Sequence, residues 1–345
     1  MPDLNAAASE LKNALGDYLA GGRQEGVFHV QIGGPGSVPA LADLDLPELH
    51  LDLLPEPPSA EQRRTLEALG YVPDGETYLH PAGWRLVLSD HRSGWRAEQQ
   101  ALRALLLADE HAAARYRQVF SSAGQSAADR ALQAAATAHH ARTVGFGPAH
   151  LVAGVLSELD APWMFAGGVA LDLHLNQVTR PHDDLDVAVS REAQSQLLSF
   201  LSDWKLDAPQ DGMYRPYTAP VEPPLHQIHA RNPHLPEVLM LDLLLTDFGG
   251  DTVGGTVGGG VWHYRRDPRV TLPLAEARLW SASGLPYLAP QAVLLFKAAT
   301  GGRELRGKDR RDFERMRPVL GREALEWLKG TLELVNPEHD WLTQL

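Results

Sequence analysis

Three aspartates in the second half of the chain carry the side chains best suited to metal-assisted chemistry. Asp184 and Asp186 stand two residues apart at the start of a segment, 185–189, that is predicted to be a strand. Side chains two apart on a strand point to the same face, so the two carboxylates are expected to lie together. Asp242 is the one acid within the apolar run VLMLDLLLT, residues 238–246. A carboxylate in such a run is rarely buried without a positive partner or a metal.

Paired carboxylates on one face repel each other unless a cation lies between them. Their hard oxygens suit Mg²⁺, which prefers octahedral geometry at about 2.0–2.1 Å and often takes further ligands from phosphates. If the strand 238–246 lies beside 185–189, Asp242 completes a cluster of three carboxylates. The alternative is that the DDLD run is simply an acidic turn before a strand, with Asp183 as a turn residue or cap.

A pair of glycines upstream of these acids could accommodate a phosphate. Gly167 and Gly168 follow the short strand predicted over 162–166 and precede a helix predicted over 169–175. Glycine lets the backbone approach a phosphate closely, and the first turn of a helix offers free N–H groups and a positive dipole end. A Gly-Gly turn alone is a weak signal, but here the acids follow about 17 residues later.

The elements that must position these residues follow from hydrophobic periodicity and from turn residues. The pattern predicts strands over residues 27–32, 48–54, 84–88, 162–166, 185–189 and 238–246. It predicts helices over residues 4–20, 60–69, 99–120, 127–142, 150–158, 169–175, 193–204, 290–298, 309–320 and 322–334. The glycine-rich stretch 249–260 is expected to be a flexible hairpin loop. Strands and helices alternate in both halves, so the expected fold class is α/β or α+β.

Composition narrows the classes of protein further. At roughly 150 residues per domain, 345 residues suggest about two domains. The formal net charge of −13 argues against broad binding to a nucleic-acid backbone. The chain has no cysteine, which excludes disulfides, thiolate metal sites and thiol nucleophiles and fits a reducing, cytoplasmic compartment. No run of about 18 apolar residues and no secretory signal is visible.

The segment GGVALDLHLNQVTRPHDDLDVAV, together with YLAPQAVLLFKA and RGKDRRDF further on, resembles the nucleotidyltransferase superfamily with its polymerase-beta-like fold. It is particularly similar to the aminoglycoside and lincosamide nucleotidyltransferases, over about residues 150–325. The resemblance implies that Gly167 and Gly168 contact phosphate and that Asp184 and Asp186 bind metal. It implies that Asp242 binds a second metal or acts as general base.

The activity implied by this resemblance is transfer of a nucleoside monophosphate from an NTP to a hydroxyl acceptor, with release of pyrophosphate. Two Mg²⁺ ions (or Mn²⁺) about 3.5–4 Å apart would assist the transfer. Lys297 is expected to face the cleft and neutralise phosphate charge, with a solvated helix lysine as the alternative. Arg180 and His182 are expected to orient the substrate or to serve the turn. Val169, where the drug-modifying enzymes often have Trp, is a departure from the pattern that bears on the acceptor.

The first half resembles the GrpB-like family, which is itself related to the nucleotidyltransferase fold. The resemblance rests on GPGSVPAL (34–41), HLDLL (50–54) and LRALLLADEHAAARY (102–116). The acid of the family's strand falls on Asp52, but Leu54 stands where a second metal ligand would be needed. We therefore expect two tandem nucleotidyltransferase-like domains, each a small mixed sheet with flanking helices: a degenerate one over 1–147, and a catalytic one with a helical tail over 148–345.

The acceptor is left open by the sequence. It could be a small molecule such as an aminoglycoside, or a protein or tRNA as in toxin-like nucleotidyltransferases. A non-catalytic nucleotide-binding regulator is the alternative from a different functional class. No membrane partner is expected, and the oligomeric state is not predicted.

Overall fold

The computed structural model describes residues 3–20, 24–89, 94–211, 213–232, 238, 240–249, 260–298 and 304–345. The chain divides into two compact units, which are treated separately below. Unit 1 comprises Met1–Gly145, Thr179–Asp183 and Asp207–Pro216, and unit 2 comprises Phe146–Val178, Asp184–Leu206 and Tyr217–Leu345. None of the helices within the described ranges is long and apolar enough to span a bilayer.

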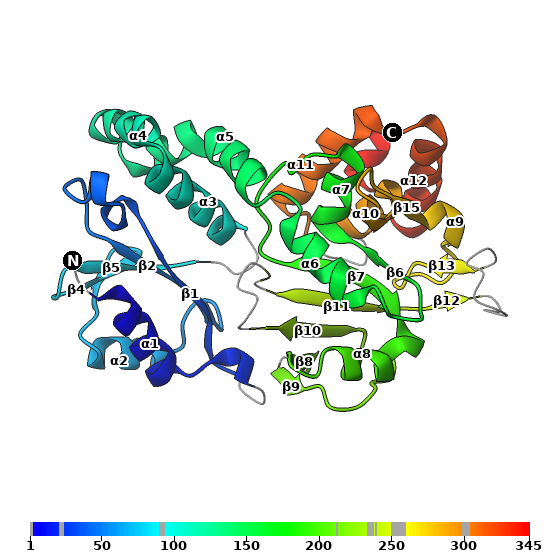
Figure 1. Cartoon of the computed structure of the whole chain (residues 1–345), viewed down its shortest axis with the longest axis horizontal. Coiled ribbons are helices and arrows are strands. Elements are labelled where there is room, and N and C mark those ends of the chain that lie inside the picture. The colour runs from blue at the N-terminus through cyan, green and yellow to red at the C-terminus, as the bar shows by residue number, and fades with distance from the viewer. Residues whose placement is uncertain are drawn as a thin grey trace. The chain divides into compact units, whose positions relative to one another are not determined.

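Unit 1 contains a five-stranded mixed sheet with the strand order β1-β2-β5-β4-β3. Its strands are β1 (Gly26–Gly33), β2 (Glu48–Leu54), β3 (Val72–Asp74), β4 (Thr77–His80) and β5 (Trp84–Leu88), with most of the hairpin β8 (Lys205–Gln210) and β9 (Met213–Pro216) also assigned to this unit. Its helices are α1 (Leu4–Leu15), α2 (Ala60–Ala68), α3 (Trp95–Ala108), α4 (Glu110–Ala123) and α5 (Gln125–Thr143). Helices α1 and α2 lie on one side of the sheet and α3–α5 on the other (Figure 1).

The alternation along β2 explains this layering. Leu49, Leu51 and Leu53 join the apolar core shared with α1 and α2. Glu48 and His50 point to the opposite face and are equally buried. The polar face of β2 is therefore enclosed rather than solvated, and its charges must find partners within the unit.

Unit 2 contains strands in the order β15-β16-β6-β7-β11-β10. These are β6 (Trp163–Phe165), β7 (Leu185–Ser190), β10 (Gln227–Arg231), β11 (Leu241–Thr246), β15 (Arg278–Trp280) and β16 (Pro286–Leu288), and a small separate sheet holds β12 (Phe248–Gly249), β13 (Val261–His263) and β14 (Thr271–Pro273). The helices are α6 (Gly147–Leu156), α7 (Gly167–Leu175), α8 (Gln194–Phe200), α9 (Leu274–Ala277), α10 (Pro290–Lys297), α11 (Gly307–Met316) and α12 (Arg322–Val335). Helices α7, α10, α11 and α12 gather on one side of the sheet (Figure 1).

The central strands of the two sheets have the same arrangement. In unit 1, β1 is antiparallel to β2, β2 is parallel to β5, and β5 is antiparallel to β4. In unit 2, β6 is antiparallel to β7, β7 is parallel to β11, and β11 is antiparallel to β10. The predicted mixed α/β class is confirmed, and each unit carries one copy of this strand arrangement.

Several predicted boundaries need correction. The helix predicted over 99–120 is two helices, because Asp109 ends α3 and its carboxylate caps α4 by accepting from the N–H groups of His111 and Ala112. The helix predicted over 4–20 ends at Leu15, before Gly16 with its positive φ. The loop predicted over 249–260 lies outside the described residues, apart from its first and last glycine.

Candidate active site

Two of the three predicted carboxylates lie side by side in unit 2. Strands β7 and β11 are parallel, and their register pairs Asp186 with Asp242. Residues paired directly across two strands share one face of the sheet, so both carboxylates point the same way. Asp242 is 6% exposed and lies within a strand whose buried leucines, Leu241, Leu243 and Leu245, point to the opposite face. The local sequence explains the strand, because LDLLLT is a short apolar run of the kind found in central strands.

Asp184 directly precedes β7 and is half-buried. It stands two residues before Asp186, so it is on the same side of the strand. Its negative charge acts on both other carboxylates, raising the pKa of Asp186 and of Asp242. The structure therefore brings the three predicted acids into one electrostatically coupled group.

The pKa values of two of these acids are strongly shifted. Burial and the charge of Asp184 raise the pKa of Asp186 to about 7, although nearby cations act in the opposite direction. Burial and the charges of Asp186 and Asp184 raise the pKa of Asp242 well above its ordinary value, against a hydrogen bond from Gln227. A cation bound between such carboxylates would stabilise their ionised forms.

Gly167 makes close approach to Asp186 feasible. It begins α7 with φ +57°, and a Cβ added there would lie 1.7 Å from Asp186 Oδ2. Gly168 is the second residue of the same helix. The N–H groups in the first turn of α7 have no partners within the helix, so they can bind an anion next to the carboxylates.

Strand β10, which the sequence analysis did not predict, supplies two polar neighbours of Asp242. Gln227 Nε2 donates to Asp242 Oδ2 at 2.5 Å, and His229 Nε2 lies 3.7 Å from Asp242 Oδ1. Burial, opposed by the charge of Asp184, lowers the pKa of His229 to about 4, so its imidazole is neutral at pH 7. The alternation in QIHAR, residues 227–231, is the signal that could have placed both side chains on one face.

Lys297 is buried, so the alternative of a solvated helix lysine is wrong, and its role at the phosphates stays a prediction. It is the last residue of α10 and is 7% exposed, and its Nζ lies 2.7 Å from Asp312 Oδ2 and 3.2 Å from Asp309 Oδ1. Its charge therefore already has two carboxylate partners on α11. The positive charges of Lys297, Lys308 and Arg306 nevertheless favour the ionised form of Asp186 and lower its pKa.

Arg180 and His182 lie in the segment Thr179–Asp183, which groups with unit 1. Arg180 donates to the carbonyl of Pro181 at 3.2 Å. Asp183 accepts a hydrogen bond from Arg96 at 3.0 Å, so it is an ion-pair partner in unit 1. Contact between Arg180 or His182 and a nucleotide stays a prediction.

The donor set fits a hard divalent cation. Asp184, Asp186 and Asp242 offer carboxylate oxygens, and Asp242 Oδ1 is a buried atom without a hydrogen bond among the described residues. In the positions found here, no three His, Asp or Glu side chains of the described ranges already form a group that could hold a metal ion. The chemistry of the oxygens fits a metal, whereas the side-chain positions do not yet form a complete site.

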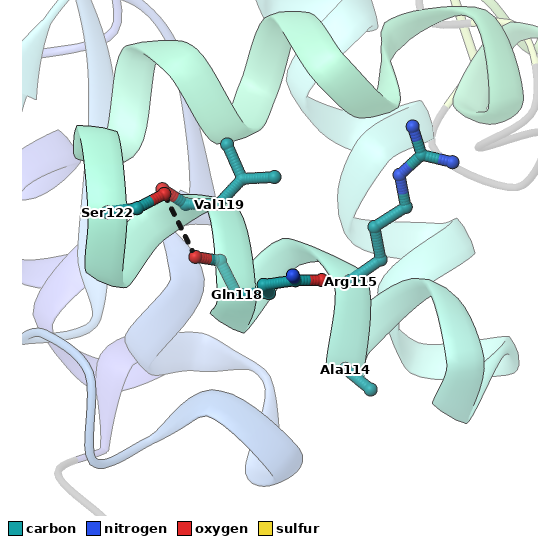
Figure 2. A pocket seen from close by; sticks show the side chains of 5 residues that line it. All are labelled: Ala114, Arg115, Gln118, Val119 and Ser122. Carbon is teal, nitrogen blue, oxygen red and sulfur yellow. Dashed lines mark hydrogen bonds between the residues drawn. The ribbon is translucent and has the colours of Figure 1, made fainter.

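A separate hollow lies on the surface of unit 1. It has a volume of about 610 Å³ and is lined by Ala114, Arg115, Gln118, Val119 and Ser122. Figure 2 shows that Ser122 turns back to the carbonyl of Gln118, to which it donates at 3.2 Å. All five lining residues belong to α4 and none is acidic, so this hollow offers no carboxylate ligand for a metal ion.

Comparison with known proteins agrees with the chemistry of unit 2. Residues 149–316 match the sequence model of a family described as Aminoglycoside-2''-adenylyltransferase. No curated protein matches the chain. The match confirms the predicted nucleotidyltransferase resemblance for the C-terminal half, and the GrpB-like resemblance of the first half stays a prediction.

Solved structures show weaker likenesses. The solution structure of the antibiotic-resistance factor ANT(2'')-Ia is 16% identical, with a TM-score of 0.38, and the match covers 55% of this chain and 92% of that one. ANT(2'')-Ia in complex with adenylyl-2''-tobramycin is 15% identical, with a TM-score of 0.39, covering 55% of this chain and 98% of that one. The lincosamide antibiotic adenylyltransferase LnuA, with lincomycin bound, is 14% identical, with a TM-score of 0.36, covering 50% and 97%. Likenesses at this level do not establish a shared substrate. The family match over residues 149–316 identifies this chain as an enzyme of the nucleotidyltransferase class.

Proposed function

We propose that unit 2 transfers a nucleoside monophosphate from an NTP to a hydroxyl group of an acceptor, with divalent metal ions. The observation that carries the proposal is the pairing of Asp186 with Asp242 across parallel strands, next to Asp184 and against Gly167. Three like charges brought together, with Asp242 buried, are unfavourable unless a cation joins them. Such an arrangement is typical of a site that exists to hold metal.

Asp184 and Asp186 would hold the metal ions, which are most simply Mg²⁺, with Mn²⁺ as a substitute and with two ions per site. When bound, these ions neutralise charge on the triphosphate and on the attacking oxygen.

Asp242 would take the proton of the acceptor hydroxyl or share in holding the second ion. The acceptor oxygen forms a new bond to the α-phosphorus, the bond from that phosphorus to the bridging oxygen breaks, and pyrophosphate leaves. A raised pKa makes the carboxylate of Asp242 a stronger base than an exposed aspartate. Gln227 holds one of its oxygens, which leaves Oδ1 for this work.

The glycine turn would bind the phosphates. Gly167 and Gly168 present the first turn of α7 beside Asp186. An anion at this position meets free N–H groups and the positive end of the helix dipole. Arg180 and His182 are retained as candidates for orienting the substrate.

The acceptor proposed here is a small polyhydroxylated and polyamino compound of the aminoglycoside type, and ATP is the proposed donor. The description of the matching family names this chemistry. The formal net charge of −13 also favours association with a cationic acceptor over an anionic one such as tRNA.

Pyrophosphate release tests the proposal. The protein is incubated with Mg²⁺ and each labelled NTP, with and without a panel of aminoglycosides, and released pyrophosphate and labelled products are followed. Pyrophosphate that depends on an aminoglycoside supports the proposal. Label on protein or RNA in a lysate would indicate a macromolecular acceptor, and tight nucleotide binding without pyrophosphate under any condition would indicate a regulator.

For unit 1, we propose a degenerate copy of the same domain, as the GrpB-like resemblance implies. Its central strands repeat the arrangement of unit 2, but the register of β2 and β5 pairs Glu48 with Arg85 where unit 2 pairs two acids. Glu48 Oε1 lies 3.3 Å from Arg85, and Glu48 Oε2 lies 2.8 Å from His50. Asp52 pairs with Arg96 at 3.3 Å. Glu48 and Asp52 are thus each paired with a cationic side chain within the unit.

A further inference from the structure

A buried ion cluster joins α10 to α11 in unit 2. Lys297 lies between Asp309 and Asp312, and all three side chains are more than nine-tenths buried. The cluster continues outward through Arg306, whose guanidinium donates to Asp309 Oδ2 at 2.6 Å and to Oδ1 at 3.1 Å. Because both helices also pack on α7, this cluster fixes the start of α11 relative to the phosphate-binding turn proposed above.

Arg306 and Lys308 flank Gly307, the first residue of α11. The side chain of Arg306 remains 51% exposed despite its bonds to Asp309, and Lys308 is half-buried. Arg306 therefore has surface left for a ligand while Asp309 holds its guanidinium in place. A guanidinium fixed on one side by a carboxylate is well prepared to bind phosphate oxygens on the other.

The charges of these two residues act on the carboxylates of the candidate active site. Burial of Arg306 is outweighed by its bond to Asp309 and by the charges of Asp309, Asp186 and Asp184, so its pKa is raised. The positive charges of Lys308 and Arg306 in turn act to lower the pKa of Asp186. The carboxylates would hold the metal side of a nucleotide, and cations next to them would face the rest of its phosphate chain.

We propose that Arg306 and Lys308 bind the β- and γ-phosphates of the donor nucleotide, and that Lys297 is a positioning residue that anchors α11. This inference rests on the proposed nucleotidyl transfer and names residues for its leaving group. Pyrophosphate carries most of the charge of the donor, so cations placed on it both bind the NTP and stabilise the group that departs. Lys297 has its own two carboxylate partners and acts through the placement of α11.

The proposal is tested by binding of a non-reactive ATP analogue, α,β-methylene-ATP, and of AMP in the presence of Mg²⁺. Arg306→Gln and Lys308→Gln are each expected to weaken binding of the analogue about 10-fold and binding of AMP less than about 2-fold. Arg310→Gln is the matched control, because it removes the same charge from an exposed position on α11. It is expected to leave both affinities unchanged.

The melting temperature of each variant controls for folding. Arg306→Lys keeps the charge but loses the guanidinium fork, so it should restore only part of the affinity. Equal weakening for the analogue and AMP, or variants that match Arg310→Gln, would overturn the phosphate contacts even if the wild-type protein releases pyrophosphate normally. A wild-type protein that binds no nucleotide and releases no pyrophosphate would instead overturn the proposed function itself, and this inference with it.

Discussion

Gly167 has no side chain, and this leaves room for the carboxylate of Asp186. Gly167→Ala places a Cβ where Asp186 Oδ2 now lies and puts alanine at a positive φ. We expect nucleotidyl transfer to fall by at least about 100-fold, because a misplacement of about 1 Å near the reacting groups can cost that much. Gly154→Ala is the control, since its added Cβ meets nothing within 4 Å in the interior of α6, and it should leave the transfer rate unchanged. Equal activity of the two variants would contradict the assigned turn.

The raised pKa values of the carboxylates predict a pH-dependent stability in the absence of metal. An acid whose pKa is raised on folding takes up protons more readily in the folded state, so the free energy of unfolding should fall as pH rises from about 4 to above 7. Asp242→Asn removes one charge from the group and should reduce that fall by about 1 kcal/mol between pH 5 and pH 8. Urea unfolding in EDTA at pH 5 and at pH 8 measures the free energy of unfolding of the wild type and the variant. An unchanged difference between the two pH values would argue against the coupling of these acids.

At the scale of elements, the cluster between α10 and α11 should contribute to the stability of unit 2. Lys297→Met leaves Asp309 and Asp312 buried with less positive charge, and breaking a buried pair in this way typically costs about 3–5 kcal/mol. Lys329→Met on the exposed face of α12 should cost no more than about 0.5 kcal/mol. Chemical denaturation measures the free energy of unfolding of the two variants. An equal loss in both would show that the cluster does not stabilise the fold.

Local patterns predicted β7 and β11 well and β10 not at all. The strands β7 and β11 are runs of apolar residues, so an acid within them stands out. Strand β10 is only QIHAR, with three polar and two apolar residues, and its role depends on its pairing with β11. The ion partners of Lys297 lie on another helix, 12 and 15 residues away, so no local period could indicate them.

At the scale of the whole molecule, we predict one nucleotide site per chain, in unit 2, although the two units share one strand arrangement. Isothermal titration with α,β-methylene-ATP and Mg²⁺ should give one site, because Glu48 and Asp52 of unit 1 are paired with Arg85, His50 and Arg96. Asp186→Asn should abolish that binding. Two sites in the wild type, or one intact site in the variant, would show that unit 1 binds nucleotide as well.

Length alone predicts about two domains but says nothing of the strand order that the two units share. Residues 48–54 were predicted as a strand, and its apolar positions are buried as alternation requires. Its polar positions are buried too, because Arg85 of β5 and Arg96 of α3 pair with their charges. Charge pairing of this kind follows from the tertiary fold, and periodicity along a single strand does not reveal it.

The central claim is that Asp184, Asp186 and Asp242 together hold divalent ions beside a nucleotide. Mn²⁺ binding followed by electron paramagnetic resonance, with α,β-methylene-ATP present, tests it most directly. The account predicts that the wild-type protein binds Mn²⁺ in a nucleotide-dependent way and that Asp184→Asn, Asp186→Asn and Asp242→Asn each weaken that binding by about 10-fold or more. Mn²⁺ binding that is the same in the three variants as in the wild type would contradict it.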